Sequence, residues 1–125
     1  MTLPAGLKKY SLSKRACFIT VRERFINFSR QAIEDLEFSP YVAFLLNEKD
    51  KICVFQVTSD KDPDKLEFYK PPKPGQQLLV RIARKDICKL ITDLSDIKDA
   101  KAIKFNAEYL KEDKAIIIDL AKPII

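Results

Sequence analysis

Residues 25–36 read FINFSRQAIEDL, and residues 79–90 read LVRIARKDICKL. When position 25 is aligned with position 79, apolar and basic side chains recur in the same order along the two stretches. The matched pairs are Ile26 with Val80, Phe28 with Ile82, Arg30 with Arg84, Ile33 with Ile87, and Leu36 with Leu90. We therefore expect one structural unit to occur twice in the chain.

A second match supports the repeat further along the chain. Residues 48–55, EKDKICVF, resemble residues 111–118, KEDKAIII, when position 48 is aligned with position 111. The second unit is thus longer than the first, and its extra residues fall around positions 93–101, where a longer connection costs little free energy. We expect a single domain, residues 1–125, built of repeats at about 14–57 and 66–121. The polar stretch 58–65, TSDKDPDK, is the expected linker between them.

Each repeat has the pattern strand, strand, helix, strand, strand. Ser29 is a good N-cap for the first helix, which Ser39 and Pro40 end. The second helix carries Ile87, Leu90, Ile91 and Leu94 at helical spacing. The expected strands are 16–21, 25–28, 41–46 and 52–57 in the first repeat, and 66–69, 77–82, 102–110 and 115–120 in the second, with the second helix at 84–94.

One repeat alone buries too little surface to be stable, since isolated hairpins are marginal in water. Two repeats whose hairpins interlock also remove most exposed sheet edges. The sequence therefore predicts a mainly β fold with two short helices: an internally duplicated (β-β-α-β-β)×2 barrel with an approximate internal twofold axis.

Composition argues against several classes of function. The chain has no histidine and two glycines, and neither glycine belongs to a phosphate-binding motif. Cys17, Cys53 and Cys88 form no CxxC motif and are expected to be reduced and to pack as small hydrophobic side chains. The aspartates of residues 60–64 lack the glycine and glutamate of a calcium loop. We expect neither an enzyme nor a bound metal or cofactor.

The sequence also bears on location. No apolar segment approaches the length needed to span a membrane, and no secretory signal follows the N-terminal lysines. Three unpaired cysteines fit a reducing compartment. We expect a cytoplasmic protein without a membrane partner, present as a monomer or a homodimer.

Basic residues are concentrated near the N-terminus. Residues 1–30 contain seven lysines or arginines and one glutamate, a net charge of +6, whereas the whole chain carries +5. Such a segment suits a polyanionic partner, or it is simply a solvated arm.

Residues 70–75, KPPKPG, form a second unusual segment. Strand-like residues flank it on both sides, so we expect a stiff hairpin loop. The alternative is a polyproline ligand for a partner domain.

Residues 28–38, FSRQAIEDLEF, are followed by a strand, the acidic turn 47–51 and another strand. This arrangement resembles the swapped-hairpin family that includes AbrB, MazE and MraZ. The second copy fits through Ile82, Arg84, Leu90 and the turn 111–114. Serine and alanine replace the family's proline at Ser29 and Ala83, and Glu37 replaces the glycine after the first helix.

The resemblance implies a swapped-hairpin fold and a DNA-binding transcriptional regulator, because most members have that role. It implies contacts from basic residues near the first turn and the helix of each repeat. If Val80 faced outward, Arg81 would instead point into the barrel. The alternative function is a non-enzymatic protein–protein interaction module, with a protein as partner. The residues implied in binding double-stranded DNA are Arg22, Arg24, Arg30, Arg81, Arg84 and Lys85, extended by Lys14 and Arg15.

Overall fold

The computed structural model describes residues 16–97 and 101–124 of the chain. Within these ranges the chain forms eight strands, two α-helices and one short 3-10 helix. They are β1 (Phe18–Arg22), β2 (Ile26–Phe28), α1 (Arg30–Asp35), β3 (Tyr41–Asn47), β4 (Ile52–Val57), β5 (Leu66–Glu67), β6 (Arg81–Ile82), α2 (Lys85–Ser95), β7 (Ala102–Leu110), η1 (Lys111–Asp113) and β8 (Ala115–Ile124).

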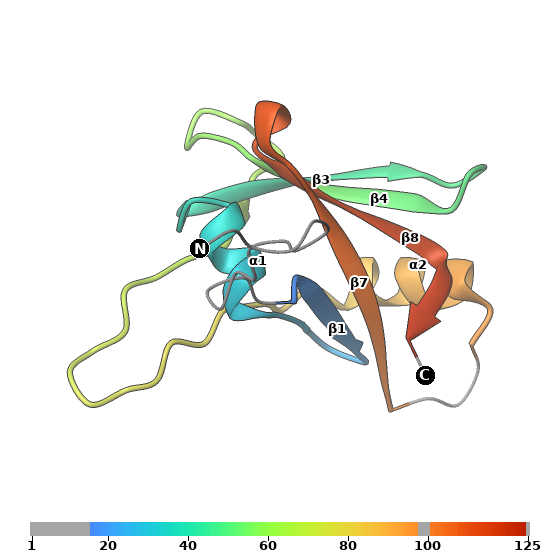
Figure 1. The fold of residues 1–125 in the computed structure, drawn as a ribbon, viewed down its shortest axis with the longest axis horizontal. Coiled ribbons are helices and arrows are strands. Elements are labelled where there is room, and N and C mark those ends of the chain that lie inside the picture. Colours follow the sequence, from blue (N-terminus) through green and yellow to red (C-terminus); the bar gives the residue numbers. More distant parts are fainter. Residues whose placement is uncertain (1–15, 98–100, 125) are drawn as a thin grey trace, which may run out of the picture.

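All eight strands belong to one antiparallel sheet in the order β5-β3-β4-β8-β7-β1-β2-β6. The sheet curves into a nearly closed barrel, around which α1 and α2 are packed (Figure 1). Its two edges are β5 and β6, which have only two residues each. The expected mainly β barrel with two helices is therefore confirmed, and its closure is incomplete at one seam.

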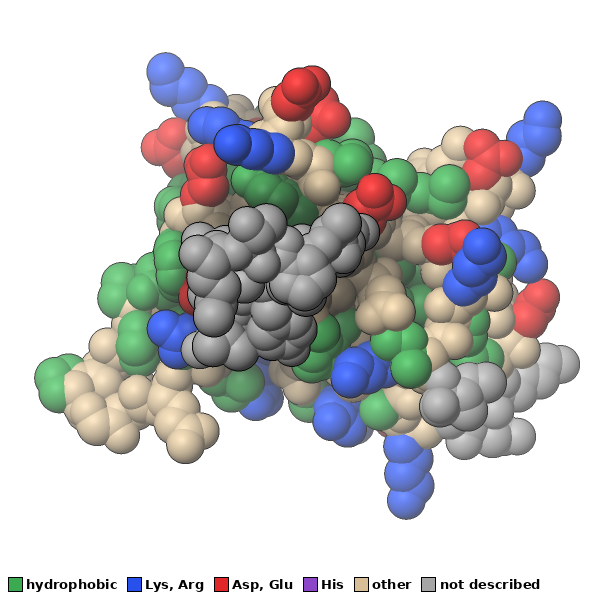
Figure 2. All heavy atoms as spheres, in the orientation of Figure 1, with side chains coloured by type: hydrophobic (Ala, Val, Ile, Leu, Met, Phe, Trp, Pro, Cys, Tyr) green, Lys and Arg blue, Asp and Glu red, His purple; other side chains and the backbone are tan. Residues whose placement is uncertain are grey.

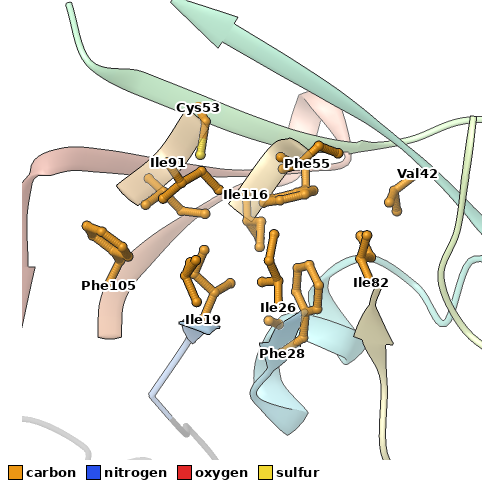
Figure 3. Close-up of a cluster of buried hydrophobic side chains, with 14 of the residues drawn as sticks. Ile19, Ile26, Phe28, Val42, Cys53, Phe55, Ile82, Ile91, Phe105 and Ile116 are labelled. Carbon is orange, nitrogen blue, oxygen red and sulfur yellow. The ribbon is translucent and has the colours of Figure 1, made fainter. Parts of the chain in front are cut away.

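Alternation along the strands builds the core. Ile19 of β1, Phe55 of β4 and Phe105 of β7 are buried. Phe28 makes edge-to-face contacts with Phe55 and Phe68, with ring centroids 5.1 and 4.9 Å apart. Figure 3 shows the side chains of this core converging from the strands and from α2. Burial of each large apolar side chain contributes about 1.5–3 kcal/mol.

The helix α1 begins where the sequence predicts. Ser29 is its N-cap, and the Ser29 hydroxyl oxygen accepts a hydrogen bond from the backbone N–H of Ala32 at 3.2 Å. The same oxygen accepts from the N–H of Phe18 at 3.0 Å, which ties the helix to β1. Ala32, Ile33 and Leu36 are buried, so one face of this short helix contributes to the core.

The helix α2 is longer and amphipathic. Ile87 and Ile91 of the expected apolar stripe are buried, together with Cys88. The stripe is wider than the buried face, because Leu90 remains 39% exposed. This face packs against β8 and β1.

The expected hairpin around the proline-rich segment is not formed. Only Arg81–Ile82 of the expected strand 77–82 is assigned as a strand, and it pairs with β2 rather than with β5. The proline-rich segment therefore joins the two edges of the sheet. The final strand runs further than expected, to Ile124, because Phe105 pairs with Pro123 beyond a register shift in which residues 119–122 of β8 bulge opposite Asn106 of β7.

Candidate nucleic-acid interface

One row of side chains crosses four neighbouring strands on the outside of the barrel. Thr20 of β1 pairs with Lys104 of β7 and with Asn27 of β2, and Asn27 pairs with Arg81 of β6. Residues directly opposite each other in a sheet share a face. The row therefore reads Lys104, Thr20, Asn27, Arg81, and its two end residues are exposed cations.

The adjacent inward-facing rows explain why this row faces solvent. Val21 pairs with Ile26 and Ile103, and Ile26 pairs with Ile82, and all four side chains are buried. Because successive residues of a strand point to opposite faces, their neighbours must point outward. Val80 is also buried, so Arg81 lies on the outer surface.

Two phenylalanine rings hold cations of this surface in place. The guanidinium carbon of Arg81 lies 4.5 Å from the centre of the Phe25 ring. The ammonium nitrogen of Lys104 lies 3.9 Å from the centre of the Phe18 ring. Each such contact contributes about 0.5–1 kcal/mol at an exposed site. The cations are therefore partly ordered before any ligand binds.

We call the set Thr20, Arg22, Asn27, Arg81 and Lys104 the basic face. Arg22 is exposed and belongs to the next outward row of β1. None of the described outward-facing residues of β1, β2, β6 and the first half of β7 is an aspartate or glutamate. In the view of Figure 2, the lower edge, where β1 and the start of β7 lie in Figure 1, has blue side chains and no red ones.

Asn27 lies near the middle of the basic face and has an unusual side chain. Its Oδ1 atom is buried and accepts no hydrogen bond from the part of the chain that the structure describes. Buried polar atoms in proteins almost always have a partner. Among the described residues, this acceptor near the centre of the basic face therefore has no hydrogen-bond partner.

Residues of β1 and α2 meet at the edge of the basic face. Arg22 and Lys85 line one cavity of about 330 Å³, together with Lys89 of α2. Val21 and Ile103 provide apolar walls there, and Glu23 and Asp93 provide carboxylates. Arg24 is exposed in the turn after β1. Arg22 and Lys85, two of the eight basic residues named from the sequence, thus lie at one cavity although they come from distant positions in the chain.

Other named arginines are engaged within the molecule. Arg84 donates two hydrogen bonds to Asp86, at 3.0 and 2.7 Å, and these bonds lower the pKa of the Asp86 carboxyl. Arg30 forms an ion pair with Glu34 at 3.3 Å. Because β2 and β6 are antiparallel, the helices that follow them begin at opposite ends of this strand pair. Arg30 is therefore remote from the end of the face where Lys85 lies.

Lys14 and Arg15 lie outside the described residues. Lys104 and Lys89 complete the basic surroundings, and neither was named from the sequence. The alternating pattern of this strand predicts that Lys104 faces outward, because its neighbours Ile103 and Phe105 face inward. Lys89 lies four residues after Lys85, on the same face of α2.

The three thiols are poor nucleophiles. Burial raises the pKa of the Cys53 thiol to about 12. Burial and the nearby Asp35 carboxylate raise the pKa of Cys17 to about 12. Burial also raises the pKa of Cys88. Since the thiolate is the reactive form, none of the three resembles an activated cysteine.

Within the stretch 58–65, the Asp62 carboxylate accepts local hydrogen bonds that stabilise the backbone. Asp62 Oδ2 accepts a hydrogen bond from the Thr58 hydroxyl at 2.9 Å, and its Oδ1 atom accepts from the N–H of Asp64 at 2.9 Å. Within residues 16–97 and 101–124, no cluster of three potential metal ligands is found. None of the described helices is long and apolar enough to cross a bilayer.

The chain was also compared with known proteins. No family model, curated protein or solved structure matches it.

Proposed function

We propose that this protein binds double-stranded DNA through the basic face and acts as a transcriptional regulator of the AbrB-like type. The observation that carries the proposal is the basic face itself. Three cations, Arg22, Arg81 and Lys104, project from β1, β6 and the first half of β7, where none of the described outward-facing residues is a carboxylate. A rigid sheet fixes their spacing, as recognition of a regular phosphate backbone requires.

The chemistry of the face suits this ligand. Arginine binds a phosphate or a guanine edge through two parallel hydrogen bonds, and lysine contributes a point charge. The Thr20 hydroxyl supplies a neutral hydrogen-bonding group between the cations. Arg24 and Lys85 extend the surface at one edge. Docking is then mainly electrostatic and releases counterions from the DNA.

A duplicated, swapped-hairpin architecture is part of the proposal, and the strand pairing supports it. Exchanging β1 with β5, β2 with β6, β3 with β7, and β4 with β8 converts six of the seven observed pairs into observed pairs. The unmatched pair is β1 with β2, whose counterpart would be β5 with β6. That missing pair is the seam of the barrel.

The registers provide independent support. Asn27 pairs with Arg81, which is its counterpart when position 25 is aligned with position 79. Val54 pairs with Ile117, its counterpart when position 48 is aligned with position 111. A residue that pairs with its own counterpart lies on a twofold axis. Both alignments of the repeat therefore agree with observed strand pairing, the first with β2–β6 and the second with β4–β8.

The backbone after α1 adds a smaller piece of support. Glu37, which replaces the family's glycine, adopts a left-handed conformation with a φ of 58°. Glycine is the residue that reaches this region without strain. The chain thus keeps the geometry of the family turn without its usual residue.

The proposed axis has a consequence for the DNA target. It passes between Asn27 and Arg81, at the end of the basic face formed by β2 and β6. Duplex DNA has twofold axes of its own, and symmetric proteins use them to read palindromic sites. Because the two halves of this chain differ in sequence, the proposed target is an imperfect palindrome.

Fluorescence anisotropy with a labelled mixed-sequence duplex tests the proposal. We expect binding that weakens steeply between about 50 and 200 mM salt. The variant Arg22→Ala, Arg81→Ala, Lys104→Ala should make the slope of log K against log salt shallower by about 3.

The matched control is Lys49→Ala, Lys61→Ala, Lys111→Ala. It removes the same charge from exposed positions outside the basic face and should keep the parent slope. Circular dichroism of both variants checks that they are folded. Equal losses in the two triple variants, or no binding by the parent at about 50 mM salt, would contradict the proposal.

A non-enzymatic interaction module is the second candidate, and a row on the opposite side of the barrel favours it. Leu45 of β3, Val54 of β4 and Ile117 of β8 are paired neighbours on the outer surface. Leu45 is 46% exposed. If the parent protein fails to bind DNA but Leu45→Lys abolishes self-association in sedimentation, this candidate takes precedence.

A further inference from the structure

The segment between β5 and β6 contains the longest run of exposed residues in the described chain. Every residue from position 70 to position 77 is exposed, and Leu79 near its end is 59% exposed. In Figure 1 this yellow-green loop extends away from the barrel. Its counterpart in the first repeat, between β1 and β2, needs only residues 23–25. The segment has to cross the seam between two unpaired edge strands, but its residues 70–77 lie exposed, away from the barrel.

Proline chemistry fixes the backbone of residues 70–74. In Pro71, Pro72 and Pro74 the pyrrolidine ring restricts φ to about −65°. Lys70, Pro71 and Lys73 each precede a proline, which disfavours the helical region for them. The segment is therefore confined to extended or polyproline II backbone. None of its residues belongs to a strand of the sheet.

A polyproline II helix has three residues per turn, so it sorts these side chains onto separate ridges. Pro71 and Pro74 share one ridge, and Lys70 and Lys73 share the next. Pro72 lies on the third. The segment thus presents a proline ridge beside a basic ridge, with the spacing P-x-x-P.

Local contacts are present at both ends of the segment. Lys70 forms an ion pair with Glu67 of β5 at 3.3 Å. At the other end, the N–H of Gln76 donates to the carbonyl of Lys73 at 2.9 Å, and the N–H of Lys73 donates to Gln76 Oε1 at 3.3 Å. Gly75 closes this turn with a φ of 83°, and no atom lies within 4 Å of where its side chain would begin. The prolines are thus displayed and not packed.

We propose that residues 70–74 are a ligand for a polyproline-binding domain of the SH3 type, on a partner protein. Such domains bind P-x-x-P segments in grooves lined by aromatic side chains. Lys70 and Lys73 are positively charged, so the complementary groove on the partner should have an acidic rim. A stiff segment loses little conformational entropy on binding, which suits it to be a ligand. The proposal does not depend on DNA binding.

Isothermal titration calorimetry tests the proposal, with the full chain titrated into a panel of purified SH3 domains that have acidic grooves. We expect saturable binding to at least one member. The double variant Pro71→Ala, Pro74→Ala should weaken that binding by at least about tenfold. The single variant Pro72→Ala is the control, because Pro72 points away from the ridge in contact, and it should bind within about threefold of the parent.

Three results would overturn the proposal. The first is no binding to any domain of the panel, and the second is an equal loss for Pro72→Ala and the double variant. The third is a loss of DNA affinity in Lys70→Ala, Lys73→Ala together with no domain binding, which would assign the segment to the nucleic-acid surface. Since the loop is exposed, all variants should keep the circular dichroism spectrum of the parent.

Discussion

Ser29 joins two elements through a single oxygen atom. Its hydroxyl accepts hydrogen bonds from Ala32 at the start of α1 and from Phe18 at the start of β1. Ser29→Ala removes the acceptor of both N–H groups and should lower the free energy of unfolding by about 1–2 kcal/mol. Urea unfolding measures this change. The control Ser59→Ala removes one hydrogen bond in the exposed linker and should change stability by less than about 0.5 kcal/mol.

The Cys53 thiol should make the stability of the protein depend on pH in the alkaline range. The pKa of the buried thiol is about 12, against 9.0 for an ordinary cysteine. Between these values the unfolded chain loses the proton while the folded chain keeps it. The free energy of unfolding should therefore fall as pH rises through this window, by about 1.4 kcal/mol per pH unit from this residue.

The variant Cys53→Val isolates the contribution of this thiol, because other groups titrate equally in both proteins. Its urea stability should fall less steeply with pH than that of the parent, and below pH 9.0 the two profiles should run parallel. Identical slopes above that pH would show that Cys53 is accessible to hydroxide in the folded state.

Some residues could be placed from the sequence and others could not. Ser29 was predicted as an N-cap, because a serine before an amphipathic run has a local chemical reason to be there. Leu45 could not be placed, since residues 41–46 are apolar on both faces and only the neighbouring strands decide which face is buried. Lys104 was missed as a site residue because its importance depends on pairing with Thr20.

At the scale of elements, α2 was predictable and β6 was not. The spacing of Ile87 and Ile91 is a local signal for a helix. Residues 77–82 have the apolar character of a strand, but a strand exists only where a partner lies beside it. In the structure residues 68–80 belong to no strand, and the ladder with β2 begins at Arg81.

The seam between β5 and β6 should be the least stable part of the sheet. Both strands have two residues and one hydrogen-bonded neighbour, whereas β4 and β8 each have two neighbours. Native-state hydrogen exchange should find the slowest amides in β4 and β8, and much faster exchange in β5 and β6. Equal protection in β5 and β4 would mean that the barrel is closed in solution.

For the whole molecule, the important feature is that the halves interlock. Four of the seven strand pairs join residues 16–57 to residues 66–124. Neither half can unfold without breaking these ladders, so unfolding should be a single cooperative transition.

Tryptophan reporters test this cooperativity, because the chain has no tryptophan of its own. Phe38→Trp reports on the first half and Tyr109→Trp on the second, at positions that are 39% and 38% exposed. Both should give the same urea midpoint as circular dichroism of the same variant. Separate midpoints for the two reporters would indicate two domains that unfold independently.

The barrel presents surfaces of different character on its opposite sides. The basic face is centred on β1, β2 and β6, and the apolar row of Leu45, Val54 and Ile117 crosses β3, β4 and β8. The pairs β2–β6 and β4–β8 are four strands apart in an eight-stranded order. A polyanionic ligand should therefore bind the basic face, and an apolar partner should bind the opposite side of the barrel.

The location of DNA binding is the most direct test of the central claim, and NMR can measure it. A ¹⁵N-labelled sample titrated with a mixed-sequence duplex at about 50 mM salt reports on each amide separately. We expect the largest shift changes at Thr20, Arg22, Asn27, Arg81 and Lys104. Changes concentrated at Leu45, Val54 and Ile117, or none at the basic face at saturating DNA, would contradict the account.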